Sequence, residues 1–80
     1  MVTRKKARTG EEFIFCNGHS AQSIPGLKKE IKKLTAEEFS FHVNNEKNDF
    51  YNWIKDCIKP DVAEQIRDLK DCEKILAALK

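Results

Sequence analysis

The fold is decided by residues 48–60, which read NDFYNWIKDCIKP. The apolar side chains of this stretch follow the i, i+3, i+4, i+7, i+8 spacing of one helical face. They are Phe50, Trp53, Ile54, Cys57 and Ile58. Asn48 is a favoured N-cap, and the Asp49 carboxylate suits the positive end of the helix dipole. Backbone before Pro60 disfavours the helical region, so the helix ends there. We expect this helix at the centre of the core.

Further helices are predicted on both sides of this stretch. Pro25 and Pro60 each suit a first helical turn, where the missing N–H would have no partner anyway. Thr35 and Glu38 have the spacing of a capping box, which begins a short second helix directly after the first. Asp71 is placed as the N-cap of the last helix. The inward positions of these four helices are Leu27, Ile31 and Leu34; Phe39, His42 and Val43; Val62, Ala63, Ile66 and Leu69; and Ile75, Leu76 and Leu79.

A β-hairpin is predicted before the helices. Residues 12–16 have the period-two pattern of a strand, with Phe13 and Phe15 on one face. The opposite face carries Ile14 and Cys16. Asn17-Gly18 predicts a type I′ turn, and residues 19–23 would form a ragged return strand. Because a lone hairpin is marginal in water, the two phenylalanines must pack it onto the helices.

These patterns predict a mainly α (α+β) fold, an N-terminal β-hairpin packed on a compact bundle of about five short helices. A chain of 80 residues holds one small domain, which we place at residues 11–80. The predicted core consists of Phe13, Phe15, Leu27, Ile31, Leu34, Phe39, Val43, Phe50, Trp53, Ile54, Ile66, Leu69, Ile75, Leu76 and Leu79.

The charge of the chain is unevenly distributed. The net charge is +2, from 15 basic and 13 acidic residues. Residues 1–10 hold four basic residues, Arg4, Lys5, Lys6 and Arg8, and no acid, so the remaining residues carry a net charge of −2. We predict that residues 1–10 form a disordered basic arm.

The composition excludes several classes of protein. No stretch approaches the roughly 20 apolar residues of a transmembrane helix, and no apolar region follows the basic N-terminus as in a secretory signal. Three widely spaced cysteines, Cys16, Cys57 and Cys72, do not form a disulfide framework. We interpret them as thiols of a cytoplasmic protein, and a Cys57–Cys72 disulfide is the less favoured alternative.

Part of the sequence resembles a small domain found in archaeal and bacterial proteins. The shared pattern is Phe13-x-Phe15-x-x-Gly18, a Ser-x-x-x-Leu helix start, Phe39-x-x-His42-Val43-Asn44 and Asn48-Asp49-Phe50-x-x-Trp53-Ile54-x-Asp56. It spans residues 12–79 and is most specific between His42 and Asp56. The resemblance implies a free-standing or appended domain of no characterised activity in a prokaryotic cytoplasm. It implies no catalytic or binding residue.

Cys16 and His19 flank the tight turn and resemble one half of a zinc site. The other ligands would have to come from His42, Cys57 and Cys72, and the sequence contains no second close pair. We therefore predict no metal and no cofactor, with Cys16 and His19 as the weak candidates for a metal site.

His42 invites a catalytic interpretation, because a His–Asp pair can act as a general base. The sequence has no phosphate-binding glycine loop and no serine elbow, and a chain this short has little material for both a core and an enclosed pocket. We predict that the chain is not an enzyme. His42, Asn44, Asn48 and Asp49 are instead interpreted as a structural polar centre of capping and hydrogen-bonding residues.

Two classes of function remain. The favoured one, reached by elimination, is a non-catalytic protein-interaction module, adaptor or regulatory, with an unknown protein partner. Its candidate surfaces are the last helix, the exposed side of the Trp53 helix, and an apolar patch of Ile58 and Val62. The alternative is nucleic-acid binding without strong sequence preference. It would use the basic arm (Arg4, Lys5, Lys6, Arg8) and the helix face of Lys28, Lys29, Lys32 and Lys33.

Overall fold

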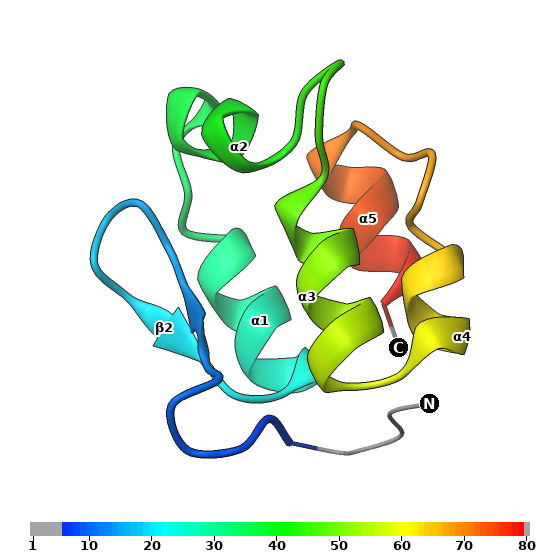
Figure 1. Cartoon of the computed structure of the whole chain (residues 1–80). Coiled ribbons are helices and arrows are strands. Elements are labelled where there is room, and N and C mark those ends of the chain that lie inside the picture. The colour runs from blue at the N-terminus through cyan, green and yellow to red at the C-terminus, as the bar shows by residue number, and fades with distance from the viewer. Residues whose placement is uncertain (1–5, 80) are drawn as a thin grey trace.

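A computed structural model describes residues 6–79 (Figure 1). The elements are β1 (Phe13–Ile14), β2 (Ser20–Ala21), α1 (Ile24–Ile31), α2 (Ala36–His42), α3 (Asp49–Cys57), α4 (Pro60–Glu64) and α5 (Cys72–Ala78). The two strands pair antiparallel, Phe13 with Ala21 and Ile14 with Ser20. This is the expected α+β architecture of one hairpin and short helices.

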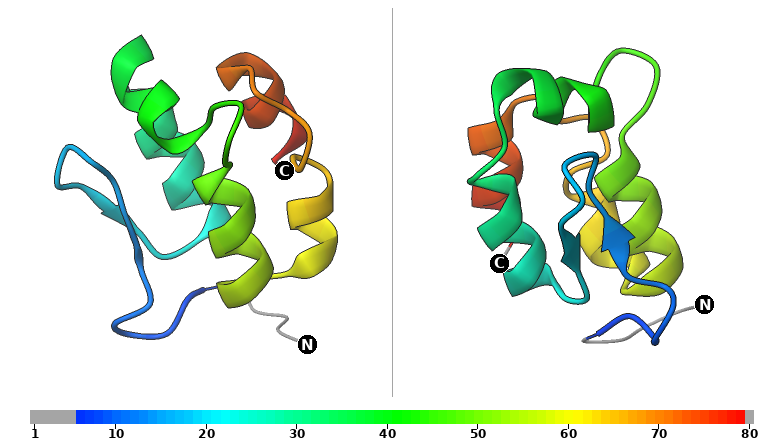
Figure 2. Two further views of the ribbon diagram at one scale, coloured as in Figure 1. Left: turned by 45° about the horizontal axis from the view of Figure 1, so that its top comes forward. Right: turned by 90° about the vertical axis from the view of Figure 1, so that its left-hand side faces the viewer.

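Helix α3 lies in the middle of the molecule, as the pattern of residues 48–60 predicts. It packs against α4, while α1 packs against β2 and α5. Figure 2 shows that the hairpin lies along one side of α1. It also shows that α2 lies across one end of the layer formed by α1 and α3. None of the helices in residues 6–79 is long and apolar enough to cross a bilayer.

The predicted caps are confirmed. Thr35 Oγ1 accepts from Glu38 N (3.1 Å), and Thr35 N donates to Glu38 Oε1 (2.9 Å), which is the full capping box of α2. Asn48 caps α3 by accepting from Tyr51 N (3.0 Å). Asp71 caps α5. The helix ends are therefore encoded locally.

The hairpin turn differs from the expected type I′. Such a turn needs φ > 0 at both central residues, but within the described chain only glycines have positive φ, and Gly18 is at +89°. Gly18 N donates to Phe15 O (3.0 Å) and Phe15 N to His19 O (2.8 Å). The Asn17 side chain accepts from His19 N (3.0 Å), which stabilises this wider turn.

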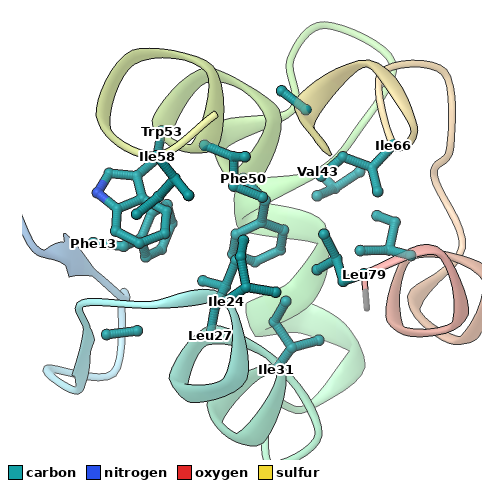
Figure 3. Close-up of a cluster of buried hydrophobic side chains, with 14 of the residues drawn as sticks. Phe13, Ile24, Leu27, Ile31, Val43, Phe50, Trp53, Ile58, Ile66 and Leu79 are labelled. Carbon is teal, nitrogen blue, oxygen red and sulfur yellow. The ribbon is translucent and has the colours of Figure 1, made fainter. Parts of the chain in front are cut away.

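The core follows the predicted faces (Figure 3). The predicted core residues are buried except Leu34, Leu69 and Leu76, which are half-buried and pack against the core. Helix α4 ends at Glu64, earlier than its pattern suggested, because residues 65–69 continue as tight turns with i→i+3 bonds such as Leu69 N to Ile66 O (3.2 Å). Ile66 is still fully buried.

Ile58 corrects one predicted surface. Its exposed fraction is 2%, so an exposed patch of Ile58 and Val62 does not exist. Lys59 is in an extended conformation between α3 and α4, and the two helices pack against each other. Trp53 is also in the core, and its indole Nε1–H donates to Glu11 O (2.7 Å).

The described end of the basic arm is packed. Lys6 forms an antiparallel bridge with Ser23, and Ala7 N donates to Gln22 O (2.7 Å). Ala7 is buried, which ties this segment to the hairpin although its composition suggested disorder. Residues 1–5, with Arg4 and Lys5, lie outside the described residues.

Candidate functional site

His42 is a buried joint between three elements. It is the last residue of α2, and its exposed fraction is 3%. Cys16 N donates to His42 Nε2 (3.1 Å), which ties the hairpin to α2. His42 Nδ1 lies 3.0 Å from Asp49 Oδ2 in the first turn of α3. The two ring nitrogens thus contact Asp49 and the backbone of Cys16.

These contacts assign the tautomer of His42. Because Cys16 N–H donates to Nε2, that nitrogen carries the lone pair, and the proton is on Nδ1, which donates to Asp49. The ring also lies against Phe13, Phe15 and Phe50, with centroids 5.2, 5.9 and 5.5 Å away. The environment is apolar except for these two bonds.

Cys16, His42 and Asp49 occur in the order of a nucleophile, a base and its orienting carboxylate. In this geometry the Nε2 lone pair is occupied by the backbone amide of Cys16, so it does not accept from the thiol. The thiol Sγ instead lies 3.9 Å from Glu38 O. A nucleophile needs a base within reach of its own proton, and the arrangement favours a structural role for His42.

Asn48 is a second polar joint. Its Oδ1 caps α3, and its Nδ2 donates to Ile66 O (3.0 Å) and Leu69 O (3.5 Å) in the connection between α4 and α5. Asn44 organises the connection before α3: its Nδ2 donates to Ser40 O (3.0 Å) and its Oδ1 accepts from Glu46 N (2.9 Å). Both amides have local structural partners.

The metal candidates have other partners. His19 Nδ1 lies 2.6 Å from Glu30 Oε1 on α1, and this hydrogen bond, with the charges of Lys33 and Lys29, lowers the pKa of Glu30. No group of three His, Cys, Asp or Glu side chains placed to hold a metal occurs in residues 6–79. Cys72 is a free thiol, so the Cys57–Cys72 disulfide is not formed, and burial, with the charges of Asp71 and Glu73, raises the pKa of Cys72.

The predicted basic residues are partly brought together. Lys28, Lys29 and Lys32 line a groove of about 290 Å³ beside Ile24 and Pro25. An adjoining groove of about 530 Å³ is lined by both Lys6 and Lys29, together with Glu12 and Glu30. We call these two grooves the basic surface.

Two members of the predicted basic set are placed differently. Lys33 Nζ lies 3.8 Å from Glu30 Oε2. Arg8 is exposed and lines neither groove.

Two large apolar side chains are exposed among the described residues. Ile14 is 64% exposed on β1, and Phe41 is 57% exposed on α2. Lys47 Nζ lies 4.6 Å from the centroid of the Phe41 ring, which also packs edge-on against His42. Neither residue was predicted as a binding surface. Their exposure could have been predicted from the sequence, because Ile14 and Phe41 lie outside the core-facing positions of the strand and of α2.

A polar groove lies between the connection before α3 and the connection after α4. Its volume is about 450 Å³, and residues 44–48, Tyr51 and residues 67–70 line it. We call it the loop groove. Asn44 and Asn48 were predicted as capping and hydrogen-bonding residues, and no local pattern indicates that residues 67–70 line the same groove.

No protein-family model matches the chain, and no curated protein or solved structure is similar to it. The functional argument therefore rests on the geometry of these surfaces.

Proposed function

We propose that this chain is a non-catalytic protein-interaction module that binds its partner through Ile14 and Phe41. The supporting observation is their exposure, 64% and 57%, in a chain whose other large apolar residues within 6–79 are buried or half-buried. Burying an exposed Phe or Ile side chain is worth about 1.5–3 kcal/mol. Aromatic residues are also enriched at protein interfaces.

Phe41 suits this role because it is held in place before any partner binds. Its ring packs edge-on against His42 with centroids 5.1 Å apart, and Lys47 covers it from one side. An ordered aromatic loses little conformational entropy on binding. Ile14 lies on the hairpin, which the hydrogen bond from Cys16 N to His42 Nε2 joins to α2, the helix that carries Phe41.

The test uses the full chain as bait and compares Phe41→Ser, Ile14→Ser and the matched control Glu37→Ser, an exposed residue of α2. We expect a specific protein partner whose affinity falls by about tenfold or more with Phe41→Ser and is unchanged by Glu37→Ser. Removal of residues 1–5 should leave this partner bound. The proposal would be contradicted by a partner that still binds both Phe41→Ser and Ile14→Ser. A partner that is lost when residues 1–5 are removed would also contradict it.

The free thiols of Cys16 and Cys72 support a cytoplasmic setting for this module. The absence of enzymatic activity remains part of the proposal. It is supported by the occupied Nε2 of His42.

A second candidate function is nucleic-acid binding through the basic surface, and one observation favours it. Lys6 precedes the hairpin and Lys29 lies in α1, yet both line the same groove. Arg4 and Lys5 directly precede Lys6 in the sequence, so the basic run continues on the N-terminal side of Lys6. Phosphate contacts by such lysines give binding that weakens as salt rises and does not depend on sequence.

The test is fluorescence anisotropy with single-stranded DNA and RNA of about 20 nucleotides, from about 50 to 200 mM salt. We compare the triple variant Lys28→Gln, Lys29→Gln, Lys32→Gln with the control Lys55→Gln, Lys59→Gln, Lys74→Gln, which removes the same charge elsewhere. The first set should weaken binding and reduce the salt slope, and the second should not. No binding at about 50 mM salt would exclude this function.

A further inference from the structure

The loop groove is formed by two connections that are distant in the sequence and locked together. Asn48 Nδ2 donates to the carbonyl of Ile66 (3.0 Å), the residue directly before the second wall, and Lys70 Nζ donates to Asn45 Oδ1 (3.1 Å). Figure 1 shows the connection before α3 and the connection after α4 side by side at the same end of the molecule. The two walls are therefore held at a defined separation.

The wall from residues 43–48 is also ordered internally. Val43 and Asn48 form an antiparallel bridge, and Asn44 N donates to Lys47 O (2.9 Å). The Asn44 side-chain amide donates to Ser40 O and accepts from Glu46 N. A groove with such walls is preorganised, so a ligand would not have to order them on binding.

The charges of the lining favour an anion. Three basic residues, Lys47, Arg67 and Lys70, and two acidic residues, Glu46 and Asp68, line the groove, so the lining carries a net charge of +1. Lys47 is engaged by Asp49 at 3.0 Å. Arg67 lies 3.7 Å from Glu64, and both side chains are more than half exposed, which makes a weak pair. The partner of Lys70 within the described residues is the neutral Asn45 oxygen, so its positive charge is not matched by that contact.

We propose that the loop groove binds a small hydroxylated anion of the phosphate-monoester class. Arg67 and Lys70 would take the phosphate, since guanidinium and ammonium groups form charge-assisted bonds with it. The Asn45 amide also lines the groove, and an amide can both donate and accept, which matches hydroxyl groups. The volume of about 450 Å³ lies within the range of small-molecule sites. This inference is independent of the proposed protein-binding anchors.

The experiment is an NMR titration of the ¹⁵N-labelled full chain with inorganic phosphate and with a sugar phosphate, against sodium chloride at equal ionic strength. We expect saturable shifts at the amides of residues 44–48 and 67–70, with the sugar phosphate tighter than inorganic phosphate. Arg67→Gln and Lys70→Gln should each weaken binding by about tenfold. Lys59→Gln, at the far end of α3, should not.

Asn45→Asp provides a variant that keeps the shape of the groove. Its carboxylate would pair with Lys70 and compete with the anion, so we expect weakening of about tenfold or more with an unchanged fold. Shifts no larger than those with chloride, or equal weakening by Lys59→Gln, would overturn the proposal. A single-stranded oligonucleotide that shifts the loop groove more strongly than the sugar phosphate would overturn the small-molecule assignment. If phosphate and the sugar phosphate shift only amides of the basic surface, the loop groove does not bind them, and this result would also overturn the proposal.

Discussion

At the scale of single residues, His42 shows how one buried side chain connects the hairpin, α2 and α3. It accepts from the Cys16 amide of the hairpin and donates to Asp49 of α3. A buried polar group is stable only when its hydrogen bonds are made, and both ring nitrogens have a partner. The same two bonds hold the Phe41 anchor in place.

Substituting His42 with Phe tests this joint. The ring volume is kept, but the Cys16 N–H and Asp49 each lose a partner, and an unsatisfied buried donor costs about 1–3 kcal/mol. We expect a loss of that size in the free energy of unfolding, measured by urea denaturation followed by circular dichroism. A stability equal to that of the wild type would show that the joint contributes nothing.

At the scale of elements, the helices are positioned by their caps, and the caps differ in what they hold. Thr35 serves only its own helix start, whereas Asn48 caps α3 and also binds the connection after α4. The pair of His19 and Glu30 links the hairpin turn to α1. Elements are thus joined by side chains at their ends as well as by the core.

The difference between the two caps is measurable. Thr35→Ala should cost about 1 kcal/mol, the usual value of an N-cap. Asn48→Ala should cost about 2–3 kcal/mol, because it also leaves carbonyl groups of the α4–α5 connection without their donor. Asn48→Asp keeps the cap and removes only the donor, so it should fall between them. Equal losses for Thr35→Ala and Asn48→Ala in urea denaturation would contradict this order.

The His19–Glu30 link predicts a pH dependence. Its hydrogen bond lowers the folded-state pKa of Glu30 below the ordinary value of 4.5. The ionised carboxylate therefore stabilises the fold above pH 4.5, and this contribution is lost as the pH falls through the folded-state pKa. We expect the difference in free energy of unfolding between wild type and Glu30→Gln to shrink as the pH falls from 4.5 through the folded-state pKa. Urea denaturation at several pH values measures this difference.

His19→Gln provides the control for this dependence. Since His19 is the main cause of the lowered pKa, Glu30→Gln introduced into that variant should change the acid dependence far less. A wild-type difference that stays constant across this acid interval would show that the link does not act on stability.

At the scale of the whole molecule, a single core holds the hairpin, the helices and the N-terminal segment together. Trp53 is central to it: the ring packs edge-on against Phe13 with centroids 5.9 Å apart, and the indole N–H reaches Glu11 O. A domain of this size has a small total stability, so the core and the surfaces it supports are lost together.

Trp53 tests this dependence. Trp53→Ala should cost about 3–5 kcal/mol, enough to unfold much of the population. Trp53→Phe retains most of the packing and loses the bond to Glu11 O, which is worth about 1 kcal/mol. Calorimetry should show a single transition with a lower midpoint for Trp53→Phe. A neutral Trp53→Ala would contradict the core position.

The sequence by itself determined the helices, their caps and most of the core. These signals are local, since a helical face and a capping box are set by residues three or four positions apart. The tertiary structure decided which of the remaining side chains are covered by other elements and which stay exposed. The spacing of Ile58 is the same whether or not the rest of the chain buries it, and Phe41 lies outside the α2 stripe whether or not another element packs there. The meeting of His42 with the Cys16 amide, of Lys6 with Lys29, and of residues 44–48 with 67–70 depends on how whole elements pack. Contacts between distant segments leave no period in the sequence, so the surfaces proposed for function emerged only from the folded chain.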